Sequence, residues 1–178
     1  MGGKKNLAAI LSLFGTLALA CGGTNSGGGT STGADIILGT PLSITGAQSN
    51  EGNLTKQGYE LWLTWINQQG GISVKGVKHK VQLKYEDDAS NANQSAVLMQ
   101  KLITEENAQF ILGPYGSAAT ATDAVVAEKN SIPMVEANGA AQAIFSHNYK
   151  FTFGVLSPAN RYLAGVIDMA TTAGRHLG

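Results

Sequence analysis

From Asp35 onwards, the chain alternates short apolar runs with longer stretches whose apolar residues recur at helical spacing. This alternation is typical of β-α-β units, because two parallel strands need a connection long enough to hold a helix. The strand-like runs cover residues 35–42, 81–86, 109–113, 133–136 and 149–153. The sequence therefore predicts an α/β fold around a parallel sheet, and roughly 140 residues suffice for one compact domain.

Three helices are expected between these strands. The first lies within residues 53–71 and ends at a glycine pair, and the second spans about 91–107 with Ser90 as its cap. The third is the alanine-rich segment after Ser117. Helical spacing predicts the buried faces of the first two. These faces comprise Leu54, Leu61, Trp62, Trp65 and Ile66 in the first helix, and Ala92, Ala96, Met99 and Ile103 in the second.

A fourth helix is expected at the end of the chain. It would begin at Ser157, which suits a cap, and Pro158, which suits a first helical turn, and Gly174 would end it. Its buried face would comprise Leu163, Val166, Ile167 and Ala170. The chain stops a few residues later with no final strand, which suggests a truncated product or a partial reading frame.

The first 34 residues combine an apolar stretch with a spacer that contains almost nothing able to build a core. Lys4 and Lys5 precede an apolar stretch over residues 7–19, and the spacer "GGTNSGGGTSTG" follows. This order is typical of an export signal, because the apolar stretch is shorter than the roughly 20 residues that a membrane span needs. We expect a lipoprotein signal peptide over residues 1–20, a flexible Gly/Ser linker over 21–34 and the folded domain over 35–178.

Cys21 is the only cysteine, so no intramolecular disulfide is possible. "Ala18-Leu19-Ala20-Cys21" resembles a bacterial lipobox, with Ala18 where a large aliphatic residue is usual. Acylation of Cys21 would anchor an exported domain to a membrane, in the periplasm or cell envelope. Two of the twelve basic residues lie in the leader, so ten remain against twelve acidic ones. This balance gives no support to binding of nucleic acid.

Three loops follow the predicted strands and are unusual in composition: "SITGAQSNEG", "GPYGSAAT" and "EANGAAQ". Ligands of open parallel sheets bind at such loops, beyond the carboxyl ends of the strands. In "GPYGSAAT" no lysine is available for a phosphate loop, and Tyr115 and Ala119 stand where a nucleophile elbow around Ser117 would need glycines. No dinucleotide fingerprint occurs, and the histidines are isolated. We therefore expect no catalytic residue, no cofactor and no metal.

The remaining interpretation of "GPYGSAAT" is a site that binds an anion at the N-terminus of a helix. The first N–H groups of a helix have no intrahelical partner and lie at the positive end of its dipole. Gly116 would let a ligand approach the backbone, and Ser117 would add a hydroxyl, which together suit a carboxylate. This loop alone leaves open the alternative that Ser117 caps its own helix.

Four longer segments carry a family resemblance: "DIILGTPLSITGAQSNEGNLTKQGYELWLTWINQQGGI", "KYEDDASNANQSA", "ILGPYGSAATATDAVVAEKNSIPMVEANGAA" and "YKFTFGVLSPANRYLAGVIDMA". Their order and spacing resemble the substrate-binding proteins of ABC importers, in the leucine-binding, or branched-chain amino acid and amide, family. The resemblance covers Asp35 to Ala173. It implies a type I periplasmic binding fold, with two α/β lobes around a ligand and no catalysis. The chain would hold an incomplete N-terminal lobe, a three-layer α/β unit with a parallel sheet, over residues 35–178.

The resemblance also implies roles for residues of the second and third loops. Ser117 matches the serine that contacts the ligand's α-carboxylate, with Gly116 and Ala118 beside it. Asn138, Gly139 and Ala140 occupy the loop where many members have a threonine that helps to bind the ammonium group. Ala140 offers no hydroxyl for that contact.

Other polar residues near the loops each allow a functional and a structural interpretation. Glu51 falls where some relatives place an aromatic residue over the ligand, which suggests a cationic or amide ligand; otherwise it is a solvated acid at a helix start. Tyr115 would stack on the ligand, which is the interpretation we favour, or cover the end of the helix. Glu136 would point into the cleft or pair with a lysine. Asp87 and Asp88 are adjacent and point to opposite sides of a strand end, and turn formation explains Asp88 better than acid-base chemistry.

The expected function is therefore a lipid-anchored or secreted substrate-binding component that binds an amino acid or amide. Its partners would be that small molecule, the ABC permease subunits in the inner membrane, and the membrane itself through the lipid. Two alternatives are a ligand-sensing domain with the same fold and a truncated lobe that binds nothing. An exported hydrolase would need a nucleophile and a base that the sequence does not supply.

Overall fold

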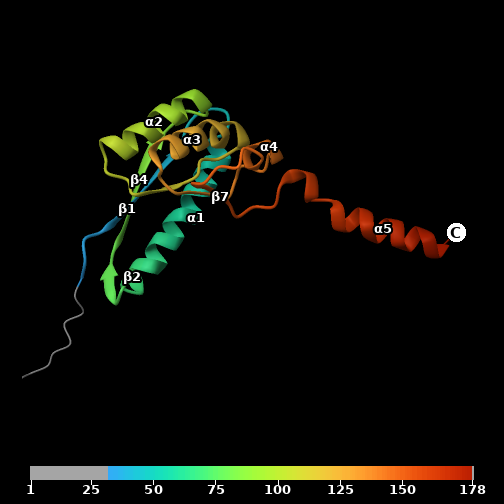
Figure 1. Ribbon diagram of the computed structural model, residues 1–178, viewed down its shortest axis with the longest axis horizontal. Coiled ribbons are helices and arrows are strands. Elements are labelled where there is room, and N and C mark those ends of the chain that lie inside the picture. The colour runs from blue at the N-terminus through green and yellow to red at the C-terminus, as the bar shows by residue number, and fades with distance from the viewer. Residues whose placement is uncertain (1–31, 178) are drawn as a thin grey trace, which may run out of the picture.

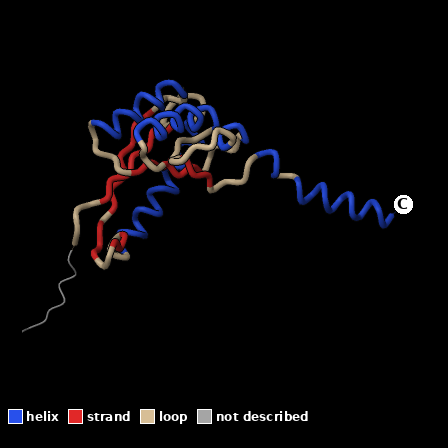
Figure 2. Tube along the Cα trace, viewed as in Figure 1, coloured by secondary structure: helices blue, strands red, loops and turns tan. Residues whose placement is uncertain are grey.

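The computed structural model describes residues 32–177, and a five-stranded parallel sheet lies at its centre (Figures 1 and 2). The strands follow the order β4-β1-β5-β6-β7. Their bounds are β1 (Ile36–Leu42), β4 (Val81–Asp87), β5 (Phe110–Leu112), β6 (Met134–Glu136) and β7 (Thr152–Gly154). Every neighbouring pair in this sheet is parallel. The predicted α/β class is confirmed, and each of the five predicted runs overlaps one of these strands.

Helices lie on both faces of this sheet (Figure 1). α2 (Ala92–Thr104) and α3 (Ser117–Asn130) pack against each other on one face, and α1 (Ser49–Gln68) packs against β4 on the other. The short α4 (Gln142–Phe145) packs beside α3. The core cluster between α2, α3 and the sheet contains Met99, Leu102, Ala108, Ile111, Ala124, Ala127 and Met134. The arrangement is the predicted three-layer one, because helices cover the sheet from two sides.

A hairpin of β2 (Ile72–Val74) and β3 (Val77–His79) stands apart from the main sheet. Its two-residue turn, Lys75-Gly76, has positive φ at both positions, 49° and 83°, as a type I′ turn requires. Thr32 pairs with Lys78 of this hairpin, so the first described residues are held beside it. The sequence-based interpretation missed the hairpin.

The cap of α2 differs from the prediction. Asn91, not Ser90, is the cap residue, and its side chain accepts hydrogen bonds from the backbone N–H groups of Asn93 and Gln94. Ser90 instead has a positive φ of 63°, and its hydroxyl donates to the backbone oxygen of Thr45. Ser90 therefore joins two loops and does not cap the start of α2.

The apolar stripe of α1 faces solvent, which the sequence did not indicate. Leu61 is 74% exposed and Trp65 is 55% exposed, while Trp62 is half-buried. A different side of α1 meets the sheet: Tyr59 donates to the backbone oxygen of Gly113, and Asn67 donates to that of Val81. The prediction that the stripe is buried is wrong for Leu61, Trp65 and also Leu54.

The last helix, α5 (Ala164–Leu177), projects from the lobe after a short 3₁₀ helix, η1 (Ala159–Arg161) (Figure 1). All residues from 159 to 175 are exposed, so the predicted buried face of Leu163, Val166, Ile167 and Ala170 is wrong for this arrangement. α5 continues through Gly174, which does not end it. Pro158 occupies the cap position of η1, and no side chain bonds there, so Ser157 is not a cap.

Within residues 32–177, no helix combines the length and the apolar character that crossing a membrane requires. The predicted signal peptide, Cys21 and most of the predicted linker lie outside the described residues.

A buried carboxyl group joins α2 to α3. Ser95 of α2 donates its hydroxyl to Asp123 of α3 over 2.9 Å, and neither side chain is exposed. One oxygen of Asp123 and one of Asp88 are buried without a hydrogen-bond partner in the described part of the chain. Burial raises the pKa of Asp123 well above its usual value; the Ser95 bond opposes this, and the charges of Asp88 and Glu136 reinforce it.

Truncation of Leu102 is expected to destabilise the core strongly. This side chain is fully buried in the cluster between α2 and the sheet, so Leu102→Ala removes buried methyl groups and leaves a cavity. We expect the free energy of unfolding to fall by about 2–5 kcal/mol in urea denaturation followed by circular dichroism. Val97→Ala is the control, because Val97 lies on the same helix but is 62% exposed. An equal loss for both variants would contradict this description of the core.

Substitution of Asp123 is expected to change how stability depends on pH. Since its pKa is raised on folding, the native state binds this proton more tightly than the unfolded state, and the contribution of Asp123 to stability falls as pH rises above about 4 towards the raised pKa. Asp123→Asn cannot ionise. Its free energy of unfolding should therefore rise relative to the wild type by about 1.4 kcal/mol per pH unit over that interval.

The exposed Asp168 provides the matched control for this measurement. Asp168→Asn should follow the wild-type dependence on pH in the same series of urea titrations. A constant difference between Asp123→Asn and the wild type from pH 4 to 8 would show that folding does not raise the pKa of Asp123.

Candidate functional site

Three loops meet at the carboxyl edge of the sheet, as parallel strands dictate. They follow β1, β5 and β6 and lead into α1, α3 and α4 respectively. Since β1 lies next to β5, and β5 next to β6, the loops are neighbours in space although about 70 and 25 residues separate them along the chain. The residues expected to bind a ligand all lie in these loops or in the first turns after them.

Ser117 is the first residue of α3, and its hydroxyl does not cap that helix. Instead, its Oγ accepts a hydrogen bond of 3.1 Å from the backbone N–H of Ala141 in the third loop. The hydroxyl proton of Ser117 is therefore left to donate to another acceptor. The capping alternative is wrong, and the hydroxyl instead joins two loops at the site.

The N-terminus of α3 is open to a ligand because of Gly116. This residue is the helix cap and has φ 86° and ψ 148°, a conformation that residues with a Cβ rarely adopt. The side chain of Gln48, from the first loop, lies next to it: a Cβ on Gly116 would be 3.4 Å from Nε2 of Gln48. The first N–H groups of α3, including those of Ser117 and Ala118, have no intrahelical partner. They suit an anionic group.

Glu136, the last residue of β6, holds the third loop in place. Its carboxylate is fully buried and accepts hydrogen bonds from the backbone N–H groups of Asn138 and Gly139 and from the hydroxyl of Thr120. Burial raises the pKa of Glu136, while these hydrogen bonds oppose the shift. Neither expected role for Glu136 is observed, since among residues 32–177 its partners include no lysine and it faces the protein interior.

Gly113 leaves room for Glu136, and Tyr59 in turn bonds to Gly113. A Cβ on Gly113 would overlap its carboxylate, so this glycine makes room for it. Tyr59 of α1 donates its hydroxyl to the backbone oxygen of Gly113 over 2.9 Å and fixes the end of β5. Burial and the charge of Glu136 raise the pKa of Tyr59. The sequence-based interpretation missed Tyr59 and Thr120, because no local pattern links them to the loops.

The adjacent carboxylates Asp87 and Asp88 hold the first loop. Asp87 accepts hydrogen bonds from the backbone N–H groups of Ile44 and Thr45 and from the Thr45 hydroxyl. Although burial acts to raise its pKa, these bonds produce a net lowering. Asp88 is buried and accepts from the hydroxyl of Ser43 and the N–H of Ser90. The expectation that Asp88 forms a turn is confirmed, and both carboxylates are structural.

The remaining expected residues are placed as follows. Tyr115, Asn138 and Ala140 are half-buried, and Gly139 is buried against Thr120. Glu51 lies half-buried in the first turn of α1, and the described contacts do not join it to Ser117. A small cavity of about 120 Å³ adjoins Ser117; it is lined by Ser117, Ala121, Ala141, Ala143, Ile144, His147 and Tyr149.

The polar groups of the three loops either bond to the loops themselves or lie at the open start of α3. Within the described part of the chain, no three His, Cys, Asp or Glu side chains are grouped to hold a metal ion. The buried carboxylates Asp88 and Glu136 have their hydrogen bonds directed to neighbouring loops. Ser117 and the start of α3 offer donors for an anionic group.

Comparison with known proteins gives a consistent result. The chain matches the family model described as "Periplasmic binding protein" over residues 35–176. The Leu/Ile/Val-binding protein homolog 2 of Brucella abortus is 28% identical over 108 residues, which make up 61% of this chain and 28% of that protein.

Two solved structures resemble the lobe. LivJ of Streptococcus pneumoniae, a branched-chain amino acid transporter substrate binding protein in complex with isoleucine, matches with a TM-score of 0.64 and 22% identity, over 70% of this chain and 34% of that one. A solute binding protein of an ABC transporter from R. palustris, in complex with 4-hydroxybenzoate, matches with a TM-score of 0.64 and 25% identity, over 80% and 37%.

The chain thus spans between 28% and 37% of the length of these three relatives. The structural likeness confirms the predicted fold, that of a type I periplasmic binding lobe. The family model covers residues 35–176, which is most of the chain, and the protein belongs to the periplasmic binding protein family.

Proposed function

We propose that this chain is the first lobe of the extracytoplasmic substrate-binding component of an ABC transporter, and that it binds an amino acid or amide of the branched-chain amino acid type for uptake. The observation that carries the proposal is the position of Ser117, at the open start of α3, where its hydroxyl donates to no acceptor among residues 32–177. Membership of the periplasmic binding protein family and the names of the relatives support the ligand class.

The ligand's carboxylate would occupy the start of α3. The N–H groups of Ser117 and Ala118 and the Ser117 hydroxyl would donate to it, and Gly116 would let it approach the backbone. Tyr115 would cover one side of the ligand. Isoleucine and 4-hydroxybenzoate, the molecules bound to the two similar structures, both carry a carboxylate, which supports this group as the common point of contact.

The third loop would contact the rest of the ligand. Asn138 offers an amide side chain there, whereas Gly139 and Ala140 offer only backbone groups. Glu51, from the start of α1, would favour a cationic or amide group. Because Ala140 has no hydroxyl, we propose that backbone oxygen atoms of this loop accept any bond from a ligand's amino group.

The proposed setting is the cell envelope. The chain would be exported by residues 1–20, anchored by lipid on Cys21 and linked by residues 21–34, and it would deliver its ligand to ABC permease subunits in the inner membrane. It would bind the ligand without transforming it. The family supports export, because its members are periplasmic binding proteins.

Replacement of Ser117 is expected to weaken binding of a carboxylate ligand. Leucine, isoleucine and 4-hydroxybenzoate would be titrated into ¹⁵N-labelled protein, with the amide signals of Ser117, Ala118 and Gly139 followed by NMR. One lobe supplies part of a site, so we expect dissociation constants of about 1 mM, and Ser117→Ala should raise them about tenfold because a hydrogen bond to a charged group is lost.

Two controls make this measurement specific. Ser146→Ala changes an exposed serine whose hydroxyl donates within α4, and it should leave binding unchanged. Isopentylamine, which is leucine without its carboxylate, should cause no shift at Ser117 or Ala118. Equal binding of isopentylamine and leucine, or unchanged affinity in Ser117→Ala, would contradict the carboxylate site.

A further inference from the structure

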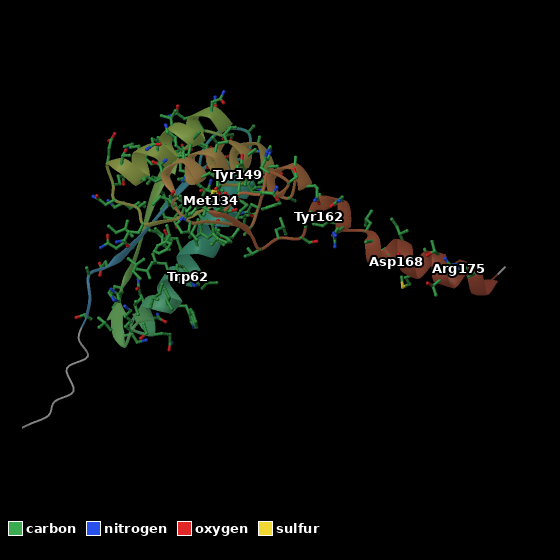
Figure 3. The ribbon with its side chains drawn as sticks, viewed as in Figure 1. Trp62, Met134, Tyr149, Tyr162, Asp168 and Arg175 are labelled. Carbon is green, nitrogen blue, oxygen red and sulfur yellow. The ribbon has the colours of Figure 1, made fainter. Side chains whose placement is uncertain are left out.

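The third loop contains the only Asn-Gly sequence in the chain, Asn138-Gly139. It follows β6, whose first residue, Met134, lies in the body of the lobe near Tyr149 (Figure 3). The backbone nitrogen that follows an asparagine can attack the carbon of its side-chain amide, and a glycine has no Cβ to hinder that approach. The product is a cyclic imide, which water opens to aspartate or isoaspartate. Asn138 is therefore the asparagine of this chain whose neighbour obstructs the reaction least.

Packing requires the glycine at position 139. It is buried, and a Cβ there would overlap the side chain of Thr120. Thr120 is itself held in place, because its hydroxyl lies 2.9 Å from both the backbone oxygen of Gly116 and the carboxylate of Glu136. The fold therefore keeps the least obstructive residue directly after Asn138.

Glu136 is placed to accept the proton that this reaction must remove, since an amide nitrogen is a poor nucleophile while it keeps its hydrogen. Oε1 of Glu136 accepts a hydrogen bond of 2.5 Å from the backbone N–H of Gly139, which is within the reach of a general base. Burial raises the pKa of Glu136, so it is a stronger base than a solvated carboxylate. The titratable groups that face it are Tyr59 on α1 and Asp123 on α3; burial, together with the charge of Glu136, raises the pKa of each.

We propose that Asn138 is a site of spontaneous deamidation, and that Glu136 is the base that removes the amide proton of Gly139. The nitrogen of Gly139 forms a bond to Cγ of Asn138, and the bond from Cγ to Nδ2 breaks. Nδ2 leaves as ammonia, which carries away the proton that Glu136 had accepted. Solvent water then adds to one of the two carbonyl carbons of the imide and gives aspartate or isoaspartate at position 138.

Either product changes the third loop. A carboxylate replaces a neutral amide close to the buried carboxylate of Glu136, and isoaspartate also adds one atom to the main chain. Ala141, three residues further on, donates its N–H to the Ser117 hydroxyl, so a shift of the loop alters the start of α3. The new negative charge would also repel a carboxylate ligand. This last consequence rests on the proposed function, whereas the modification itself does not.

Peptide mass spectrometry of the purified chain, sampled during incubation at neutral pH, tests the proposal. We expect Asn138 to show the mass gain of an amide converted to an acid before any other asparagine, including the exposed Asn148. Enzymatic methylation of isoaspartate would identify the rearranged product.

Glu136→Gln tests the role of the base. Its side-chain oxygen can still accept the two backbone N–H groups, and Thr120 keeps its bond to the oxygen of Gly116, but an amide is not a base. Deamidation at Asn138 should slow by about tenfold or more. Glu128→Gln is the matched control, because the Glu128 carboxylate also accepts two backbone N–H groups, those of Lys150 and Phe151, and it should leave the rate unchanged. Circular dichroism would confirm that each variant folds.

The dependence of the rate on pH separates catalysis by Glu136 from catalysis by hydroxide. Glu136 must be ionised to act as a base, so the rate in the folded chain should rise through its raised pKa and level off above it. In the chain unfolded by urea, the rate should keep rising with the hydroxide concentration. Deamidation of another asparagine first, or equal rates in Glu136→Gln and the wild type, would overturn the proposal.

The effect on binding is measured separately. Asn138→Asp carries the charge of the product and should weaken leucine binding several-fold in the NMR titration. A chain that deamidates at Asn138 but shows no binding of leucine would contradict the proposed function and support the modification.

Discussion

The loops at the carboxyl edge of the sheet depend on the hydrogen bonds of the buried Glu136 carboxylate. Removing a carboxylate from water is costly unless hydrogen bonds replace those of the solvent, and Glu136 finds them in Thr120 and in the backbone of the third loop. The same group requires a glycine at position 113 and lies near the Tyr59 hydroxyl. One side chain thus joins the end of β6 and the third loop to α3.

This arrangement explains why the start of α3 is suited to binding. The third loop, fixed by Glu136, places the N–H of Ala141 against the Ser117 hydroxyl, so that hydroxyl is oriented before any ligand arrives. Asp87 and Asp88 fix the first loop in the same manner. Polar groups oriented in advance cost less to order on binding than mobile ones. Three buried or hydrogen-bonded carboxylates thus hold the first and third loops beside the start of α3.

Local periodicity was sufficient to predict the parallel sheet, the helices and the loops that carry the candidate site. It failed where the outcome depends on what covers a surface. The stripes of α1 and α5 are truly apolar, yet Leu61 and Ile167 are exposed, since a pattern shows which residues avoid water but not which neighbour covers them. Contacts between distant residues, such as Tyr59 with Gly113, left no local signal. The hairpin turn at Lys75-Gly76 did leave one, because a glycine between two short apolar runs is a recognised turn pattern.

The pairing of Thr32 with Lys78 places the first described residues beside the β2-β3 hairpin, at one end of the sheet. Thr32 precedes β1 and lies at the amino ends of the strands, whereas Ser43 and the loop around it lie at their carboxyl ends. The seven residues of β1 separate these two ends by about 23 Å. Thr32 therefore lies at the end of the sheet opposite the loops of the candidate site.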